Sequence, residues 1–274
     1  MQSVIDYFSN IPSAHRSAIL LGGLTLFFLL EGGIPRYRKP YKKGTHALIN
    51  IFFTLTTVLI NFLMAGILLW ASRWTTTNQF GIMNWLPPMP LWLEIVIGVL
   101  LLDLIGAYFI HWLEHKVRWM WQFHLVHHTD PNVDTTTANR HHPGESVFRF
   151  VFTTLGVVFA GTSIGIVILY QSMSVVLSQF NHANIRVPAA LENALSWVFI
   201  TPSMHRVHHH YKQPYTDTNY GNIFSFWDRI FGTYAMMKPD DIVFGVDTYM
   251  APEEHSNIGE LLKIPFGKYR PPTA

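Results

Sequence analysis

The strongest constraint on the fold of this chain is a run of 36 residues without a charged side chain, from Phe150 to Ile185. As one straight helix it would measure roughly 54 Å at 1.5 Å per residue, whereas the hydrocarbon core of a bilayer is about 30 Å thick. Gly156, Gly161 and Gly165 lie within the run. We therefore expect a helical hairpin of two short limbs that turns back near these glycines.

Three further apolar tracts precede this run, at 17–30, Ala47–Trp70 and Leu91–Ile110. Charged residues make up 13% of the chain, about half of the roughly 25% in soluble domains. We predict an all-α integral membrane protein with about four membrane helices or hairpin limbs, built as one membrane-embedded domain over residues 1–274. The first tract is expected to remain as a helix, because its basic residues follow the apolar stretch, unlike those of a signal peptide.

Positive charge orients these tracts in the membrane. Five basic residues lie at 36–43, between the first two tracts, whereas residues 73–90 contain only Arg73. Because cytoplasmic loops are the more basic ones, we expect the 36–46 loop in the cytoplasm and 73–90 outside. The third tract then runs inward, and the hairpin returns the chain to the same side. The histidine clusters described next are thus expected in a helical cap on the cytoplasmic face.

Histidine is unusually frequent, with 15 residues, and its spacing is regular. One pair has the spacing H-x3-H, which stacks both rings on one face of a helix. Two triplets have the spacing H-x2-HH, of which about 0.04 copies are expected by chance at this frequency of histidine. The pair is followed along the chain by the two triplets: His111 and His115; His124, His127 and His128; His205, His208 and His209.

This clustering indicates metal binding, because neutral imidazole is a good ligand for iron, zinc, copper and nickel. One metal takes about four to six ligands, so eight to ten histidines predict two metals. His142 and His182 lie near the same face and are further candidate ligands. An all-histidine site near a membrane favours iron that activates dioxygen, and zinc can replace iron during purification.

Carboxylates near these histidines are candidate partners for their second ring nitrogens, since a ligating histidine usually donates its other N–H to such a group. Asp103 lies inside the third tract, eight residues before His111, and an acid inside a membrane is functional by default. The full set of candidates is Asp103, Glu114, Asp130, Asp134, Glu145, Asp217 and Asp228.

Six motifs follow one another along residues 95–235: DxxxxYxxHxxxH (103–115), FHxxHH (123–128), HPxE (142–145), HAN (182–184), HRxHH (205–209) and NYGxxxxxWDRxFGT (219–233). In this order they resemble the fatty acid hydroxylase/sterol desaturase superfamily, especially its compact bacterial members. The resemblance implies a membrane oxygenase in which histidines hold two irons. Such enzymes hydroxylate or desaturate lipids or sterols, and both outcomes stay open here.

The resemblance also implies which residues bind the metals. The eight histidines of the pair and the triplets match its ligand positions, and His142 and His182 match further positions. Some lipid hydroxylases of the superfamily carry a second H-x3-H before the last triplet, but this chain has Arg186 there. His142 is therefore a candidate to complete the ligand set. His141 and His210 lie where the family does not need histidine.

The composition limits the partners. The net charge of +2 leaves no basic excess for nucleic acid, and the absence of cysteine excludes Cys-ligated zinc, iron–sulfur clusters and thiol nucleophiles. The chain also has no G-x-G-x-x-G nucleotide motif. An oxygenase of this kind is expected to receive electrons from NAD(P)H through a separate reductase and a ferredoxin or cytochrome-like carrier. Its substrate is expected to be a membrane lipid.

Two other functions stay open. The sequence HWLEH at 111–115 also matches the H-x-x-E-H motif of zinc hydrolases, which predicts Glu114 as a base. A non-enzymatic histidine-rich membrane protein, such as a metal carrier or a bis-histidine haem protein, is the third hypothesis. The zinc hydrolase leaves both triplets unexplained, carriers bind near the membrane midplane, and haem needs only two axial rings. Metal analysis and the visible spectrum separate the three.

Overall fold

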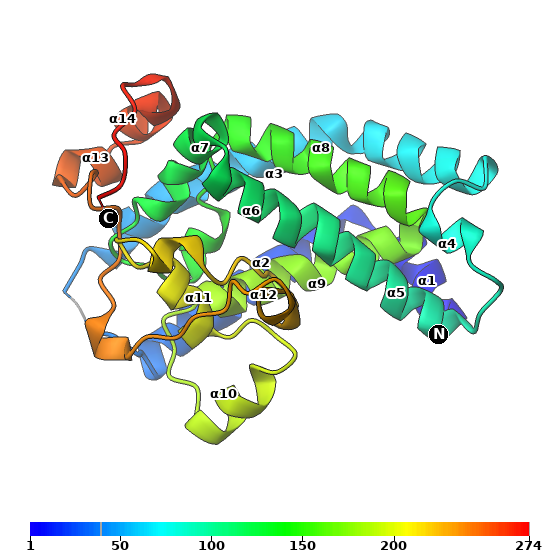
Figure 1. Cartoon of the computed structure of the whole chain (residues 1–274), viewed down its shortest axis with the longest axis horizontal. Coiled ribbons are helices and arrows are strands. Elements are labelled where there is room, and N and C mark those ends of the chain that lie inside the picture. The colour runs from blue at the N-terminus through cyan, green and yellow to red at the C-terminus, as the bar shows by residue number, and fades with distance from the viewer. Residues whose placement is uncertain (39, 274) are drawn as a thin grey trace.

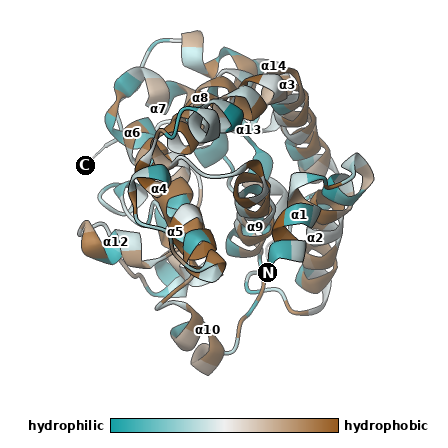
Figure 2. Ribbon diagram, turned by 90° about the vertical axis from the view of Figure 1, so that its right-hand side faces the viewer, coloured by the Kyte–Doolittle hydropathy of each residue, from teal (hydrophilic) through white to brown (hydrophobic). Residues whose placement is uncertain are grey.

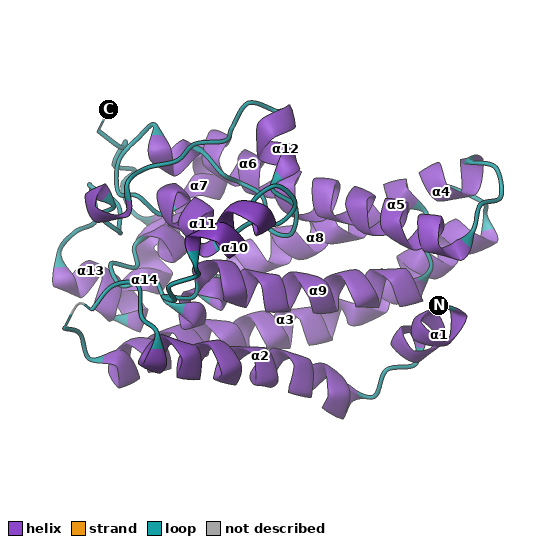
Figure 3. Ribbon diagram, turned by 90° about the horizontal axis from the view of Figure 1, so that it is seen from below, coloured by secondary structure: helices purple, strands orange, loops and turns teal. Residues whose placement is uncertain are grey.

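The computed structural model describes residues 1–38 and 40–273, and across them the regular structure is helical, with isolated bridges and no strands (Figure 3). The all-α prediction is confirmed. The long elements are α2 (Ser13–Gly33), α3 (Lys43–Thr77), α8 (Pro143–Ala160), α9 (Ile164–His182) and a composite helix of α5 (Leu91–Asp103), the π-helical turn η1 (Leu104–Phe109) and α6 (Ile110–Lys116).

Four stretches are long and apolar enough to cross a membrane: Ser13–Gly33, Lys43–Trp85, Leu91–Lys116 and Ile164–His182. They include the second limb of the predicted hairpin, α9. The first limb, α8, is outside this set, because its first two turns carry Glu145 and Arg149.

The hairpin between α8 and α9 is confirmed, and Gly161 makes its turn. This residue has φ +71°, and a Cβ there would lie 2.5 Å from the carbonyl oxygen of Phe80. Only glycine suits a left-handed conformation with so little space. Gly156 and Gly165 lie inside α8 and α9, where their missing side chains let neighbouring helices approach.

The long helices pack side by side into a bundle (Figure 1). α3 lies against α8, while α9 lies against α2 and against α1 (Gln2–Ser9). Leu102, Val157 and Ile166 are fully buried where α5, α8 and α9 meet. The outer helices α2 and α3 carry hydrophobic residues along their length (Figure 2), and Leu63 on α3 is 71% exposed. Such outward apolar faces suit contact with lipid.

Short helices gather at one end of the bundle, beside the ends of α6 and α9 and opposite the N-terminus (Figure 1). The chain places α4 (Ile82–Trp85) near the N-terminal end. The remaining elements are α7 (Arg118–His128), η2 (Thr135–Asn139), α10 (Ala189–Leu195), α11 (Pro202–His208), η3 (Tyr215–Asp217), α12 (Phe226–Ile230), η4 (Pro239–Asp241), α13 (Pro252–Ser256), α14 (Ile258–Lys263) and η5 (Ile264–Phe266).

Candidate metal centre

Nine histidines converge where α6, α7, α9 and α11 meet. Within each of two groups, one ring nitrogen per residue lies within 4.8 Å of the others. We name them group A and group B: group A contains His111, His115, His124, His128 and His208, and group B contains His127, His182, His205 and His209.

Each H-x2-HH triplet contributes to both groups. His124 and His128 are four residues apart on α7 and enter group A, while His127 enters group B. The second triplet has the opposite arrangement, since His205 and His209 enter group B and His208 enters group A. Residues four apart lie on one face of a helix, and the third histidine lies on a neighbouring face.

The two groups adjoin each other. The rings of His128 (group A) and His209 (group B) stack with centroids 4.7 Å apart. The rings of His124 and His127 are also parallel, at 5.1 Å. A metal in each group would therefore lie beside a metal in the other.

Hydrogen bonds fix which ring nitrogen of His111 and of His124 faces into group A. His111 Nδ1 donates to the carbonyl oxygen of Tyr220 at 2.8 Å, and His124 Nδ1 donates to Glu145 Oε1 at 2.8 Å. Each Nε2 therefore carries a lone pair in the neutral ring. These two Nε2 atoms lie only 3.1 Å apart. Two facing lone pairs repel each other, so the arrangement calls for a cation between the rings.

Group B shows the same pattern around His182. Its Nδ1 donates to the carbonyl oxygen of Ser178 at 2.8 Å, which leaves the lone pair on Nε2. That Nε2 lies 3.0 Å from His205 Nε2, 3.2 Å from His127 Nε2 and 3.3 Å from His209 Nε2. Four imidazole nitrogens directed at one point are a fitting donor set for a transition metal.

Several buried ring nitrogens have no partner among the described residues, including His115 Nε2 and His208 Nε2 in group A. Leaving such groups unpaired is costly. Burial also holds the pKa of His124, His128 and His208 well below the usual value. The neutral ring is the form that binds metal. The residues present thus fit two metal ions.

His142 is outside both groups, contrary to the expectation that it completes the ligand set. It precedes α8 and caps that helix, since its Nδ1 accepts from the backbone N–H of Gly144 at 3.0 Å. Its Nε2 contacts the carbonyl oxygen of Leu262 at 3.3 Å. Both ring nitrogens are used by the backbone, and the fourth position of group B is filled by His182.

Two carboxylates bond directly to clustered histidines. Glu145 contacts His124 as described, and Asp217 Oδ1 lies 3.2 Å from His115 Nδ1. Each holds a ring with its Nε2 directed into group A. Burial raises the pKa of the Asp217 carboxyl, but His115 and then Lys116, at 2.6 Å, lower it to about 2.

Asp228 and Asp103 act on the histidines through a loop, and not by direct contact as expected. Asp228 accepts from the backbone N–H groups of Tyr220 and Gly221 at 2.8 and 3.0 Å. Asp103 accepts from the backbone N–H of Ile223 at 3.3 Å and from the indole N–H of Trp227 at 3.1 Å. Neither contacts a clustered histidine. They hold the loop whose Tyr220 carbonyl orients His111.

Asp130 and Asp134 also lie away from the clustered rings, contrary to expectation. Both contact His46 on α3: Asp130 Oδ1 lies 2.8 Å from its Nε2, and Asp134 Oδ2 lies 3.2 Å from its Nδ1. Thr137 donates to Asp130 at 2.7 Å. This network joins the first turn of α3 to η2 instead of orienting a ligand.

Three residues near the groups lie outside the sequence predictions. Arg149 donates through Nε to Glu145 at 2.9 Å and through Nη2 to Glu114. His141 stacks on His127 with centroids 4.7 Å apart, and its Nδ1 lies 2.8 Å from Glu145. Tyr220 belongs to the motif at 219–233, but it acts through its backbone carbonyl, a role that the motif does not reveal. Arg149 follows Glu145 by four residues and directly precedes the uncharged run. This spacing could have identified Arg149 from the sequence.

The same ion pair bears on the zinc hydrolase hypothesis. A hydrolase base needs a free carboxylate beside the metal-bound water. Glu114 is fully buried, and its carboxylate contacts Arg149. His111 and His115, the two zinc ligands of that hypothesis, both belong to the five-histidine group A.

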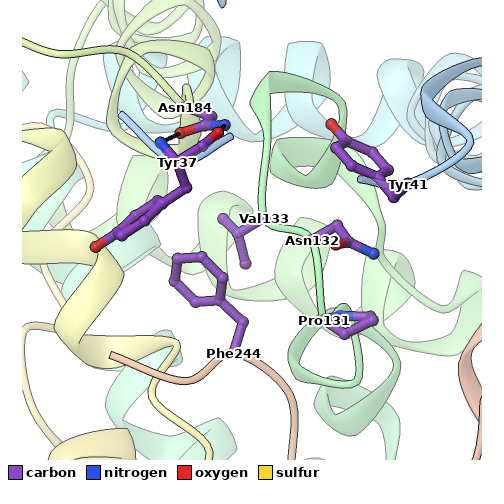
Figure 4. Close-up of a pocket in the computed structure, with 7 residues that line it drawn as sticks. All are labelled: Tyr37, Tyr41, Pro131, Asn132, Val133, Asn184 and Phe244. Atoms are coloured by element: carbon purple, nitrogen blue, oxygen red, sulfur yellow. Dashed lines mark hydrogen bonds between the residues drawn. The ribbon is translucent and has the colours of Figure 1, made fainter. Parts of the chain in front are cut away.

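A cavity of about 510 Å³ reaches the histidines from within the bundle. His111, His127, His182 and His205 are among its lining residues, and most of the others belong to α2, α3, α8 and α9. A smaller pocket lies between Tyr37 and Phe244 (Figure 4) and measures about 10 Å³, which is room for one water. The larger cavity is therefore the candidate substrate site.

Comparison with known proteins agrees with this geometry. The fatty acid hydroxylase family model matches residues 95–233, about half of the chain. This chain belongs to the fatty acid hydroxylase family. The matched segment contains every histidine of groups A and B.

Relatives of this family member act on lipids and sterols according to their names. It is 24% identical to an ornithine lipid hydroxylase of Rhizobium tropici over 55% of its own length and 44% of the relative. It is 32% identical to an alkylglycerol monooxygenase of Xenopus tropicalis over 52% of its length and 30% of the relative. A methylsterol monooxygenase of Arabidopsis thaliana is 25% identical over 85% of the chain and 90% of the relative.

The chain thus spans 44% and 30% of the length of these first two relatives, less than half of each. No solved structure matches it significantly.

Proposed function

We propose that this family member is a membrane-bound, dioxygen-dependent oxygenase with two irons that hydroxylates, or desaturates, a lipid or sterol-like substrate. The observation that carries the proposal is the pair of adjoining imidazole groups at the end of a cavity between membrane helices. The names of the relatives support the same class of reaction.

The nine histidines of groups A and B are the proposed ligands, with four or five for each metal. Iron at this site would supply the reduction of dioxygen and the oxidation of an unactivated C–H bond. For hydroxylation, the substrate C–H, one dioxygen, two electrons and two protons become C–OH and one water. The atoms and electrons of the reaction therefore require an external reductant.

The protein positions the reactants. Glu145 and Asp217 keep His124 and His115 in the orientation that directs Nε2 into group A. The cavity between α2, α3, α8 and α9 holds the apolar substrate beside the histidines and limits its contact with water. Such positioning determines which carbon of the substrate is oxidised.

The electrons are proposed to come from NAD(P)H through a separate carrier of the ferredoxin or cytochrome type. The 274 residues contain no cysteine for an iron–sulfur centre and no G-x-G-x-x-G motif. We place the histidine groups on the cytoplasmic side, because the ends of α2 and α3 that flank the basic stretch of the sequence lie at the same end of the bundle as they do. A soluble carrier can then reach them.

The test is product formation in membranes that contain the protein. With labelled dioxygen and an added reductant system, lipid extracts should contain a hydroxylated product that carries label from the gas. Membranes with the His209→Ala variant serve as the control and should lack that product. A desaturated lipid, formed only with dioxygen, would support the desaturase outcome. Turnover under strict anaerobiosis would overturn the proposal and favour a hydrolase.

A further inference from the structure

Arg149 places a cation on the wall of the cavity, close to the histidines. It lies on α8 and is a lining residue of the 510 Å³ cavity, as are His111 and His205. Glu145, which Arg149 contacts through Nε, also accepts from His124. Glu145 therefore connects the guanidinium to His124, which is a proposed metal ligand.

The guanidinium of Arg149 has more N–H groups than its two carboxylate acceptors use. Of its five N–H groups, Nε donates to Glu145 and Nη2 donates to Glu114, while Nη1 has no partner among the described residues. The side chain keeps 26% of its exposure, and the cavity is on its open side. A charged donor on the wall of a cavity gains from an acceptor on the ligand.

The surrounding charges decide which kind of acceptor fits. Glu114 and Glu145 are fully buried and both contact Arg149, so the positive charge of the guanidinium is already paired within this buried group. A further anion there would find no unpaired positive charge on Arg149. A hydroxyl, ether or carbonyl oxygen accepts a hydrogen bond without adding charge.

Apolar side chains line much of the rest of the cavity, among them Leu20 on α2 and Val58 and Phe62 on α3. We propose that Arg149 binds a neutral oxygen of the substrate, so that the substrate is an oxygenated lipid oxidised at a carbon near that oxygen. This inference rests on the proposed function for the identity of the cavity as the substrate site.

The experiment measures binding without turnover. Purified, metal-loaded protein in nanodiscs is kept anaerobic, and saturable binding of tritiated probes is followed by scintillation proximity. Two matched pairs differ only in oxygen: hexadecanol against hexadecane, and cholesterol against cholestane. Hexadecyl methyl ether and palmitate are added as competitors. For at least one pair, the oxygenated probe should bind about tenfold more tightly, and palmitate should compete less well than the ether.

Two variants assign the preference to Arg149. Arg149→Met removes the donors, and Arg149→Lys keeps a cation beside Glu114 and Glu145 but loses the guanidinium fork. Both should lose most of the preference for the oxygenated probe. Arg118→Met is the matched control, because it makes the same change at an arginine of α7 that does not line the cavity. It should bind as the wild type does.

Metal content and thermal stability are measured for each variant, so that Arg149→Lys decides the matter if Arg149→Met does not fold. A preference that persists in a metal-loaded Arg149 variant overturns the inference, as does equal binding of both members of each pair by the wild type. Tighter binding of palmitate than of the ether also overturns it, since the acceptor would then be an anion. Failure of oxygenation with an intact preference would count against the proposed function alone.

Discussion

Adjacent residues His208 and His209 belong to different groups, although both end the same triplet. The C-terminal turn of α11 directs the first toward His115 and the second toward His182, with ring centroids 4.8 and 5.1 Å apart. Group A keeps four histidines without His208, whereas group B keeps three without His209. Loss of His209 therefore leaves its group with fewer ligands than loss of His208 does.

This inequality predicts different metal losses. His209→Ala should lower the metal content by about one ion per chain, because three ligands hold a metal poorly in a site built for four. His208→Ala should retain more metal than His209→Ala. The measurement is metal analysis of purified protein by inductively coupled plasma mass spectrometry.

The control at this scale is His142→Ala, whose ring nitrogens contact backbone groups. It should retain the wild-type metal content. Loss of an ion in this variant, or equal losses in the other two, would contradict the assignment of groups A and B.

At the level of secondary-structure elements, the turn between α8 and α9 requires a glycine. Gly161 and Gly232 both have φ +71°, but their surroundings differ. A Cβ at 161 would lie 2.5 Å from the carbonyl oxygen of Phe80 and 2.6 Å from Asn84 Nδ2, whereas nothing lies within 4 Å of a Cβ at 232. Substitutions at these two glycines therefore separate the free-energy cost of the left-handed conformation from the cost of a steric clash of the new Cβ.

We expect Gly232→Ala to destabilise the protein by about 1 kcal/mol, the cost of a left-handed conformation for a residue with a side chain. Gly161→Ala should lower the apparent melting temperature clearly more, because it adds the collision with the Phe80 carbonyl. Thermal unfolding in detergent, followed by the loss of the monodisperse species, measures both. Equal shifts would mean that α8 and α9 do not meet the 80–84 segment closely.

The π-helical turn η1 is the other element that matters to the site. It lies between Asp103 and His111 in the third membrane stretch and widens the helix locally. Such turns are frequent at functional sites. Asp103 and His111 both contact the 220–227 loop, so this turn and that loop together orient the first histidine of group A.

At the scale of the whole molecule, the path of the chain places all nine histidines at one end. α6 and α9 both arrive there, and the turn at Gly161 is what allows α9 to return. The C-terminal end of α2 and the N-terminal end of α3 lie at that end too, while α4 lies at the other (Figure 1).

Cysteine labelling tests this arrangement, and the chain has no native cysteine to remove. Arg38, Arg186 and Gln79 are exposed and suit single replacements. Arg38→Cys and Arg186→Cys should react with an impermeant maleimide only from the cytoplasmic side, and Gln79→Cys only from outside. Labelling of positions 186 and 79 from the same side would contradict the hairpin, and labelling of 38 from outside would reverse the orientation.

Features that depend on local repetition along the chain are predictable without the structure. Uncharged runs such as Phe150–Ile185 dictate membrane helices, because bilayer thickness and helix rise are fixed quantities. Histidines four apart, such as His124 and His128, must share a helix face. The metal-binding class and the hairpin therefore follow from spacing alone.

The tertiary structure alone decided the features that depend on contacts between distant segments. It brings His182 into group B, leaves His142 as a helix cap, and pairs Asp103 with a loop more than a hundred residues away. It also places Arg149 between two buried carboxylates on the cavity wall. A partner's identity depends on how helices pack in space, and spacing along one helix carries no information about the helix that lies against it.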